Sequence, residues 1–168
     1  MKENNFFRAA IVLFVLSMVG YVWAYQSLPL RYPSHFNFDG VPDGWTDKNL
    51  FSWFIIPAIS LALLSFMYFI TPLFRKYPQF INIPGKEKFL ELSDERKEPV
   101  FKLAENLMGM IAIVEQLLFL YIQYAMWSAA LSPGNMMPPH STLIIIGHSV
   151  FVLGIVIFYL VKISDKID

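Results

Sequence analysis

Four long apolar segments limit what this chain can fold into: residues 6–25, 51–74, 107–131 and 142–161. Each has 20 residues or more and at most one charged side chain, and about 20 apolar residues of helix cross a hydrocarbon core of about 30 Å. Of all 168 residues, 56% are hydrophobic and 15% are charged, which is too apolar for a water-soluble fold of this size. The sequence therefore predicts an all-α fold: a polytopic membrane protein with four transmembrane helices in a single domain over residues 1–168.

The distribution of lysine and arginine predicts how the helices are oriented. Eleven of these residues lie in the N-terminus, the 75–102 loop and the C-terminus, and two lie in the 26–50 and 132–141 loops. Cytoplasmic loops are enriched in Lys and Arg. We therefore expect both termini and the 75–102 loop in the cytoplasm and the other two loops outside. The first span is expected to remain as a signal-anchor helix, because its apolar run is longer than a signal-peptide core.

The first outer loop is rich in residues that form turns. Asp-Gly dipeptides stand at 39–40 and 43–44, and three prolines restrict the chain around them. We expect an ordered loop in which Asn37, Asp39 and Asp43 bond to nearby backbone, while His35 bonds across the loop. The aromatic side chains that flank it are expected at the headgroup level of the membrane. They are Tyr32, Trp45 and Trp53.

This loop resembles the signature of a bacterial membrane family. Leu-Pro at 28–29, Pro-x-His-x-Asn at 33–37, Gly40, Asp43-Gly44 and Lys48 follow the first span in the pattern of the N-terminal module of SdpI-type immunity proteins. Those proteins protect a bacterium from its own secreted peptide toxin and hold a transcriptional repressor at the membrane. The resemblance implies a multi-pass protein of the bacterial cytoplasmic membrane that recognises a peptide or protein partner through residues 28–48. The candidate binding residues are His35, Asn37, Asp39, Gly40, Asp43, Gly44, Trp45 and Lys48. The second signature of full-length members, a Gly-Arg-Thr-Pro-like motif, is not found in the sequence.

Polar residues inside the spans form a second group of candidates. Glu115 is costly in hydrocarbon, so it either acts as a proton or ion site or is neutral and hydrogen-bonded within the bundle. Gln116 and Gln123 share a helix face and are expected to make interhelical hydrogen bonds. His148 is expected to bond a neighbouring carbonyl or hydroxyl group. If the spans are level, His148 and Glu115 differ by about 10 Å in depth, too far for a direct hydrogen bond.

Other classes of site have weaker support. His35, His140 and Asp43 are of ligand type for zinc, but they lack metal-ligand spacing, so we expect no metal and no cofactor. No catalytic motif is present, and the net charge of zero argues against nucleic acid as a partner. The 75–102 loop mixes both signs of charge. It is expected either to lie on the inner leaflet through Phe89 and its neighbours or to dock a cytoplasmic partner.

Three hypotheses remain open. The first is a non-enzymatic membrane protein, immunity-like or signalling-like, that binds a partner through the outer loop. The second is a small transporter, or an accessory subunit of one, that uses Glu115 for protons or ions. Four helices are few for a carrier, so this second hypothesis implies a homo-oligomer. The third is a metal-dependent membrane enzyme with its metal at His35, His140 and an aspartate.

Overall fold

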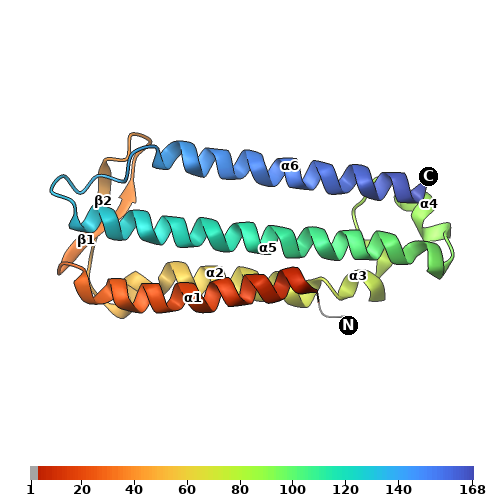
Figure 1. The fold of residues 1–168 in the computed structure, drawn as a ribbon, viewed down its shortest axis with the longest axis horizontal. Coiled ribbons are helices and arrows are strands. Elements are labelled where there is room, and N and C mark those ends of the chain that lie inside the picture. Colours follow the sequence, from red (N-terminus) through yellow and green to blue (C-terminus); the bar gives the residue numbers. More distant parts are fainter. Residues whose placement is uncertain (1–3) are drawn as a thin grey trace.

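Four long helices run side by side in the computed structural model, which describes residues 4–168 (Figure 1). They are α1 (Asn5–Ser27), α2 (Leu50–Ile70), α5 (Asp94–Leu131) and α6 (Ser141–Ile167). Each is long and apolar enough to cross a membrane, α2 together with the short helix α3 (Leu73–Lys76). The predicted all-α polytopic membrane fold is confirmed. Lys2, which contributed to the charge bias, lies outside the described residues.

Two helix boundaries differ from the sequence expectation or refine it. Helix α5 is 38 residues long and begins 13 positions before the expected span, because Ser93 ends the preceding segment and the acidic residues 94–95 suit the first turn of a helix. Helix α2 contains Pro57 and runs to Ile70, short of the expected end at residue 74. Thr71 is its C-cap residue, just before Pro72.

The first outer loop contains a small sheet, which the turn pattern did not predict. Strands β1 (Arg31–Phe36) and β2 (Pro42–Asp47) pair in antiparallel fashion. We call the end of the bundle that carries this pair the hairpin end. The chain ends near the opposite end (Figure 1), which we call the basic end.

Helix α5 lies at the centre of the bundle. It packs against α1 and α2 on one side and against α6 on the other (Figure 1). No residue in the most apolar window of α6 is buried, and large side chains such as Phe151 and Phe158 are more than half exposed. Lipid solvates such surfaces at no cost relative to a protein core. The exposure therefore agrees with a membrane span.

At the basic end, the 75–102 segment folds back onto the bundle. It comprises a 3-10 turn, η1 (Pro78–Phe80), and helix α4 (Lys86–Glu91) before α5 begins. Phe89 is fully buried and packs with Phe101, Val100 and Ile163. The expectation that Phe89 lies on the inner leaflet is therefore wrong, since it packs against α5 and α6 instead.

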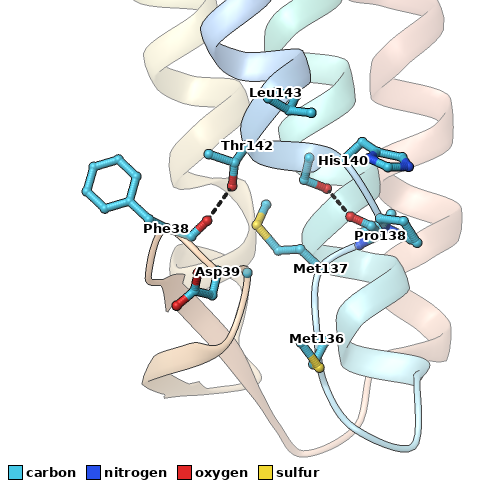
Figure 2. Close-up of a pocket in the computed structure, with 11 residues that line it drawn as sticks. Phe38, Asp39, Met136, Met137, Pro138, His140, Thr142 and Leu143 are labelled. Atoms are coloured by element: carbon cyan, nitrogen blue, oxygen red, sulfur yellow. Dashed lines mark hydrogen bonds between the residues drawn. The ribbon is translucent and has the colours of Figure 1, made fainter.

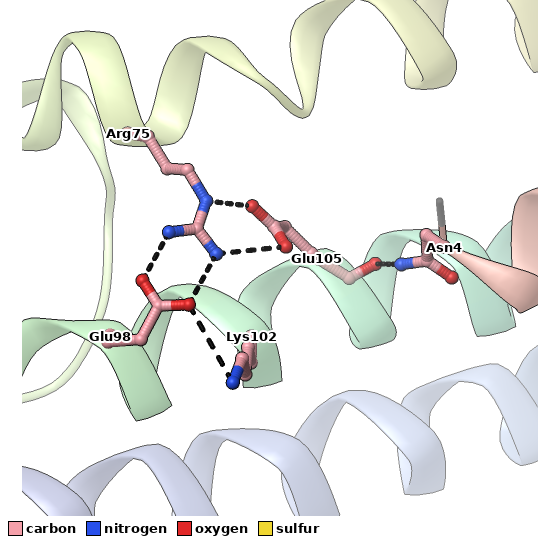
Figure 3. Close-up of polar contacts among 5 residues, drawn as sticks. All are labelled: Asn4, Arg75, Glu98, Lys102 and Glu105. Atoms are coloured by element: carbon pink, nitrogen blue, oxygen red, sulfur yellow. Dashed lines mark hydrogen bonds and ion pairs between the residues drawn. The ribbon is translucent and has the colours of Figure 1, made fainter. Parts of the chain in front are cut away.

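An ion-pair network holds α3 to α5 at this end (Figure 3). The Arg75 guanidinium donates to the carboxylates of Glu98 and Glu105, and Lys102 lies 3.7 Å from Glu98. Asn4, at the start of α1, donates to the Glu105 carbonyl oxygen at 2.9 Å. The network thus joins α1, α3 and α5 at one point. It fixes the orientation of the 75–102 segment at the basic end.

Candidate functional site

Asn37 organises the tip of the hairpin. Its Oδ1 accepts hydrogen bonds from the backbone N–H groups of Asp39 and Val41, both at 3.0 Å. Gly40 completes the turn with a φ of 76°, which side-chain-bearing residues rarely adopt. The expected backbone bonding is therefore present at Asn37, which holds the tip in one conformation.

His35 and Asp43 brace the hairpin across its two strands. The His35 Nδ1 and Asp43 Oδ1 atoms are 2.5 Å apart, so the predicted bond across the loop is present. Gly44 stands opposite His35 in the register, and a Cβ there would lie 2.8 Å from the His35 Cβ. The second Asp-Gly dipeptide is thus explained by close packing of the two strands.

Lys48 joins the hairpin to the end of α1. Its Nζ donates to the carbonyl oxygens of Gln26 and Leu28, at 3.3 and 2.9 Å, and lies 4.9 Å from the centre of the Tyr25 ring. These contacts occupy the ammonium group within the protein. Lys48 therefore positions the hairpin.

Tyr32 and Trp53 anchor the hairpin to the helices. Both are fully buried within the protein, with ring centres 5.7 Å apart. Trp53 donates to the Tyr21 carbonyl oxygen at 2.9 Å, and the Tyr32 hydroxyl donates to Ser52 at 3.1 Å. Burial raises the pKa of the Tyr32 hydroxyl above its ordinary value. The polar atom of each ring is satisfied, which permits burial of two large aromatic side chains.

The two outer loops meet at the hairpin tip and enclose a pocket (Figure 2). Met137 donates its backbone N–H to the Gly40 carbonyl oxygen at 3.0 Å. Thr142 donates its hydroxyl to the Phe38 carbonyl oxygen at 2.8 Å. The pocket between the loops has a volume of about 450 Å³. Its lining includes Phe38, Asp39, Gly40, Met136, Met137, His140 and Leu143.

The pocket separates the predicted loop residues into two groups. Asp39, Gly40 and His140 line it, whereas the other predicted binding residues do not. Those others are His35, Asn37, Asp43, Gly44, Trp45 and Lys48. The sequence analysis missed Phe38, Met136 and Met137. The feature that these three residues share in the sequence is an apolar side chain in an outer loop. No local motif connects the two loops.

His140 does not join His35 and Asp43. Within residues 4–168, no three His, Cys, Asp or Glu side chains form a group that could hold a metal ion. His140 instead precedes α6 in the left-handed conformation, with a φ of 66°. The three residues considered as metal ligands, His35, His140 and Asp43, are therefore not grouped in the described part of the chain.

The two glutamines of α5 make the predicted interhelical hydrogen bonds. Gln116 Oε1 accepts from the Ser60 hydroxyl of α2 at 2.7 Å, and Gln123 Nε2 donates to the Trp53 carbonyl oxygen at 3.3 Å. The glutamines and Ser60 are buried. These bonds tie α5 to α2 inside the apolar region.

Glu115 and His148 lie together between α5 and α6. Glu115 Oε1 is 3.8 Å from His148 Nε2, with the side chains 20% and 13% exposed. The prediction that they differ by about 10 Å in depth is wrong, because it took the centres of the two spans as level. The Tyr121 hydroxyl donates to Ser141 Oγ at 2.8 Å, so residues 122–131 of α5 project past the start of α6 by about 15 Å.

The fold and site define a helical membrane protein that presents a braced hairpin at one end. A family model described as a domain of unknown function (DUF1648) matches residues 12–61. The matched region runs from within α1, through the hairpin, to within α2. No curated protein and no solved structure matches the chain. The family match covers all eight predicted loop residues but not the 132–141 loop.

Proposed function

We propose that this chain is a non-enzymatic membrane protein that binds a peptide, or an extended segment of a protein partner, at its outer face. The observation that carries the proposal is the pocket of about 450 Å³ between the hairpin tip and the 132–141 loop. Pockets of this volume bind small ligands, and they can also hold a few adjacent side chains of a peptide. The charge bias of the loops supports an outward-facing pocket.

The lining residues suggest what the ligand contains. Phe38 is 87% exposed and Met136 is 48% exposed, so these two apolar side chains are open to a ligand instead of being packed in a protein core. Methionine side chains adapt to apolar ligands of varied shape. The Asp39 carboxylate lines the same pocket. An apolar side chain next to a lysine or arginine would complement this combination.

The rigidity of the hairpin supports recognition. Asn37, the His35–Asp43 pair and Lys48 hold the hairpin through hydrogen bonds within the chain. A preorganised loop loses less conformational entropy when it binds a partner. These residues therefore act by positioning the tip, and the ligand contacts come from the pocket lining.

The resemblance to SdpI-type proteins suggests a particular form of this function. In that form, the ligand is a secreted peptide toxin of the host bacterium, and the protein confers immunity. A host strain that lacks the gene should then be inhibited by spent medium of its parent strain, and expression of the protein should restore growth. Equal growth with and without the gene would exclude the immunity form while leaving peptide binding to be tested directly.

A binding selection tests the general proposal. Purified protein in lipid nanodiscs is used to select from a displayed library of short random peptides, with empty nanodiscs as the background. Phe38→Ala should weaken the selected peptides by about tenfold, which corresponds to about 1.4 kcal/mol. Asp39→Asn should weaken those that contain Lys or Arg.

Matched controls are available on the same hairpin. Leu30 is as exposed as Phe38, at 87%, and lies outside the pocket, so Leu30→Ala should leave binding unchanged. Asp47→Asn is the control for Asp39, since Asp47 is also exposed and outside the pocket. Enrichment no better than on empty nanodiscs, or equal losses in Leu30→Ala and Phe38→Ala, would refute a binding site in the pocket.

A further inference from the structure

We propose that Glu115 and His148 form a proton-binding site inside the bundle that exchanges protons with the pocket at the hairpin end. The first observation that supports this proposal is the short distance between the two side chains. Glu115 and His148 are the one acidic residue and the one histidine in the apolar segments 107–131 and 142–161, which contain no lysine or arginine. The fold brings their side-chain atoms to 3.8 Å.

The hydrogen-bonding state of His148 is the second support. Its Nε2 has no hydrogen-bond partner and is shielded from solvent. A separation of 3.8 Å from Glu115 Oε1 is too long for a hydrogen bond. A small side-chain movement, or one water molecule, would connect this pair, as proton transfer requires.

Electrostatics favours one bound proton. With one proton, the pair is neutral overall, either as a carboxylic acid beside an imidazole or as a carboxylate beside an imidazolium. Removal of that proton leaves a net negative charge in an apolar region, and addition of a second leaves a net positive charge. Both are costly there. The proton can move between the two residues without changing the net charge of the site.

Within residues 4–168, neither Glu115 nor His148 forms an ion pair with a third residue. On α5, Glu105 lies ten residues from Glu115, about 15 Å along the axis, and is bonded to Arg75. On α6, Lys162 lies 14 residues from His148, about 21 Å away. The remaining ionisable side chains of the four spans are Arg8, Tyr21, Tyr25, Tyr68, Tyr121, Tyr124 and Tyr159. Of these, Tyr121 is the one that bonds across from α5 to α6.

The route to the outside follows from the level of the two helices. Ser141 lines the pocket, and its Oγ accepts a hydrogen bond from the Tyr121 hydroxyl at 2.8 Å. His148 lies seven residues beyond Ser141, or about 10 Å along α6, and Glu115 lies six residues before Tyr121, or about 9 Å along α5. Glu115 and His148 therefore lie about two helical turns from the pocket. The hydroxyl groups of Tyr121 and Ser141 stand at the pocket end of this interval. Such a site is what the transporter hypothesis would require.

Infrared spectroscopy of the full chain in nanodiscs tests the site. A protonated carboxyl group in an apolar setting gives a resolved C=O band, which should respond to pH and be absent from Glu115→Gln. In His148→Gln, which lacks the imidazole partner, the response of the band to pH should differ from that of the unmodified protein. Asp47→Asn, altered at an exposed carboxylate outside the pocket, should not move it. A band that ignores pH, or that titrates identically in His148→Gln, would overturn the proposal.

Two further measurements protect the test from misfolded variants. In the unmodified protein, the ¹⁵N resonance of His148 should change over the same pH range as the carboxyl band, and independent titration of the two would overturn the coupling. In liposomes with oriented protein, a pH change applied at the hairpin side alone should alter the band. A response that arises only from the basic side would overturn the proposed exchange with the pocket.

Discussion

The Tyr121 hydroxyl donates to Ser141 Oγ at 2.8 Å, and Ser141 in turn donates to the Pro138 carbonyl oxygen at 2.6 Å. This relationship sets the level of α6 against α5. It also holds the 136–142 segment against the bundle, where that segment forms one wall of the pocket. One hydroxyl pair thus links α5 to a wall of the outer pocket.

Replacement of Tyr121 by Phe should loosen this wall. Loss of one hydrogen bond costs about 0.5–1.5 kcal/mol, so hydrogen exchange at the His140 and Ser141 amides should accelerate by about tenfold or less. Tyr124→Phe is the control, because Tyr124 is half exposed and lies one turn further along α5. Equal exchange in the two variants would show that Ser141 is held by other contacts.

Substitution of Gly44 by Ala should disrupt the hairpin. The added Cβ would meet the His35 Cβ at 2.8 Å, and relief of such a contact costs about 1–3 kcal/mol. Trypsin should then cleave after Arg31 or Lys48 faster than in the unmodified protein. In the other outer loop, Gly134→Ala places its Cβ 3.8 Å from Met136 Cγ and should not change the cleavage rate. Unchanged cleavage in Gly44→Ala would contradict the close strand packing.

Cysteine labelling checks the orientation that the charge bias predicts. The chain has no cysteine, so a single introduced thiol reports one position. A membrane-impermeant maleimide should label Phe38→Cys in intact cells and Phe80→Cys only after permeabilisation. The two positions are 87% and 79% exposed, so a difference in labelling reports sidedness. The reverse pattern would place the pocket in the cytoplasm and refute an outward-facing binding site.

The bond between Ser60 and Gln116 should contribute measurably to the packing of α2 on α5. Hydrogen bonds between membrane helices contribute about 0.6 kcal/mol on average. This one is short, at 2.7 Å, and buried, so Ser60→Ala should lower the unfolding free energy by about 0.5–1.5 kcal/mol. Steric trapping in bicelles measures the change. Ser149→Ala is the control, because Ser149 is exposed and bonds within its own helix. A double-mutant cycle with Gln116→Leu should show coupling, and additive losses would disprove the interaction.

Part of the candidate site could be predicted from local sequence. The Asp39-Gly40 dipeptide and Asn37 predict a turn because each acts on its own backbone, and the bond from His35 spans only eight residues. Phe38 and Met136 lie in loops separated by two spans, so their shared pocket left no sequence spacing to detect. The paired strands were missed because six-residue segments with proline and glycine have weak strand patterns.

The four helices were determined by the sequence alone, because the hydrocarbon core requires length and apolarity from each span separately. How those helices are aligned was decided only by the tertiary structure. Helix α5 begins well before its apolar segment and extends past α6 at the hairpin end, and this offset brings Glu115 and His148 to the same depth. Hydropathy is insensitive to such an offset, since lipid solvates an apolar helix equally well over a range of depths. Specific contacts such as the Tyr121–Ser141 hydrogen bond select one alignment.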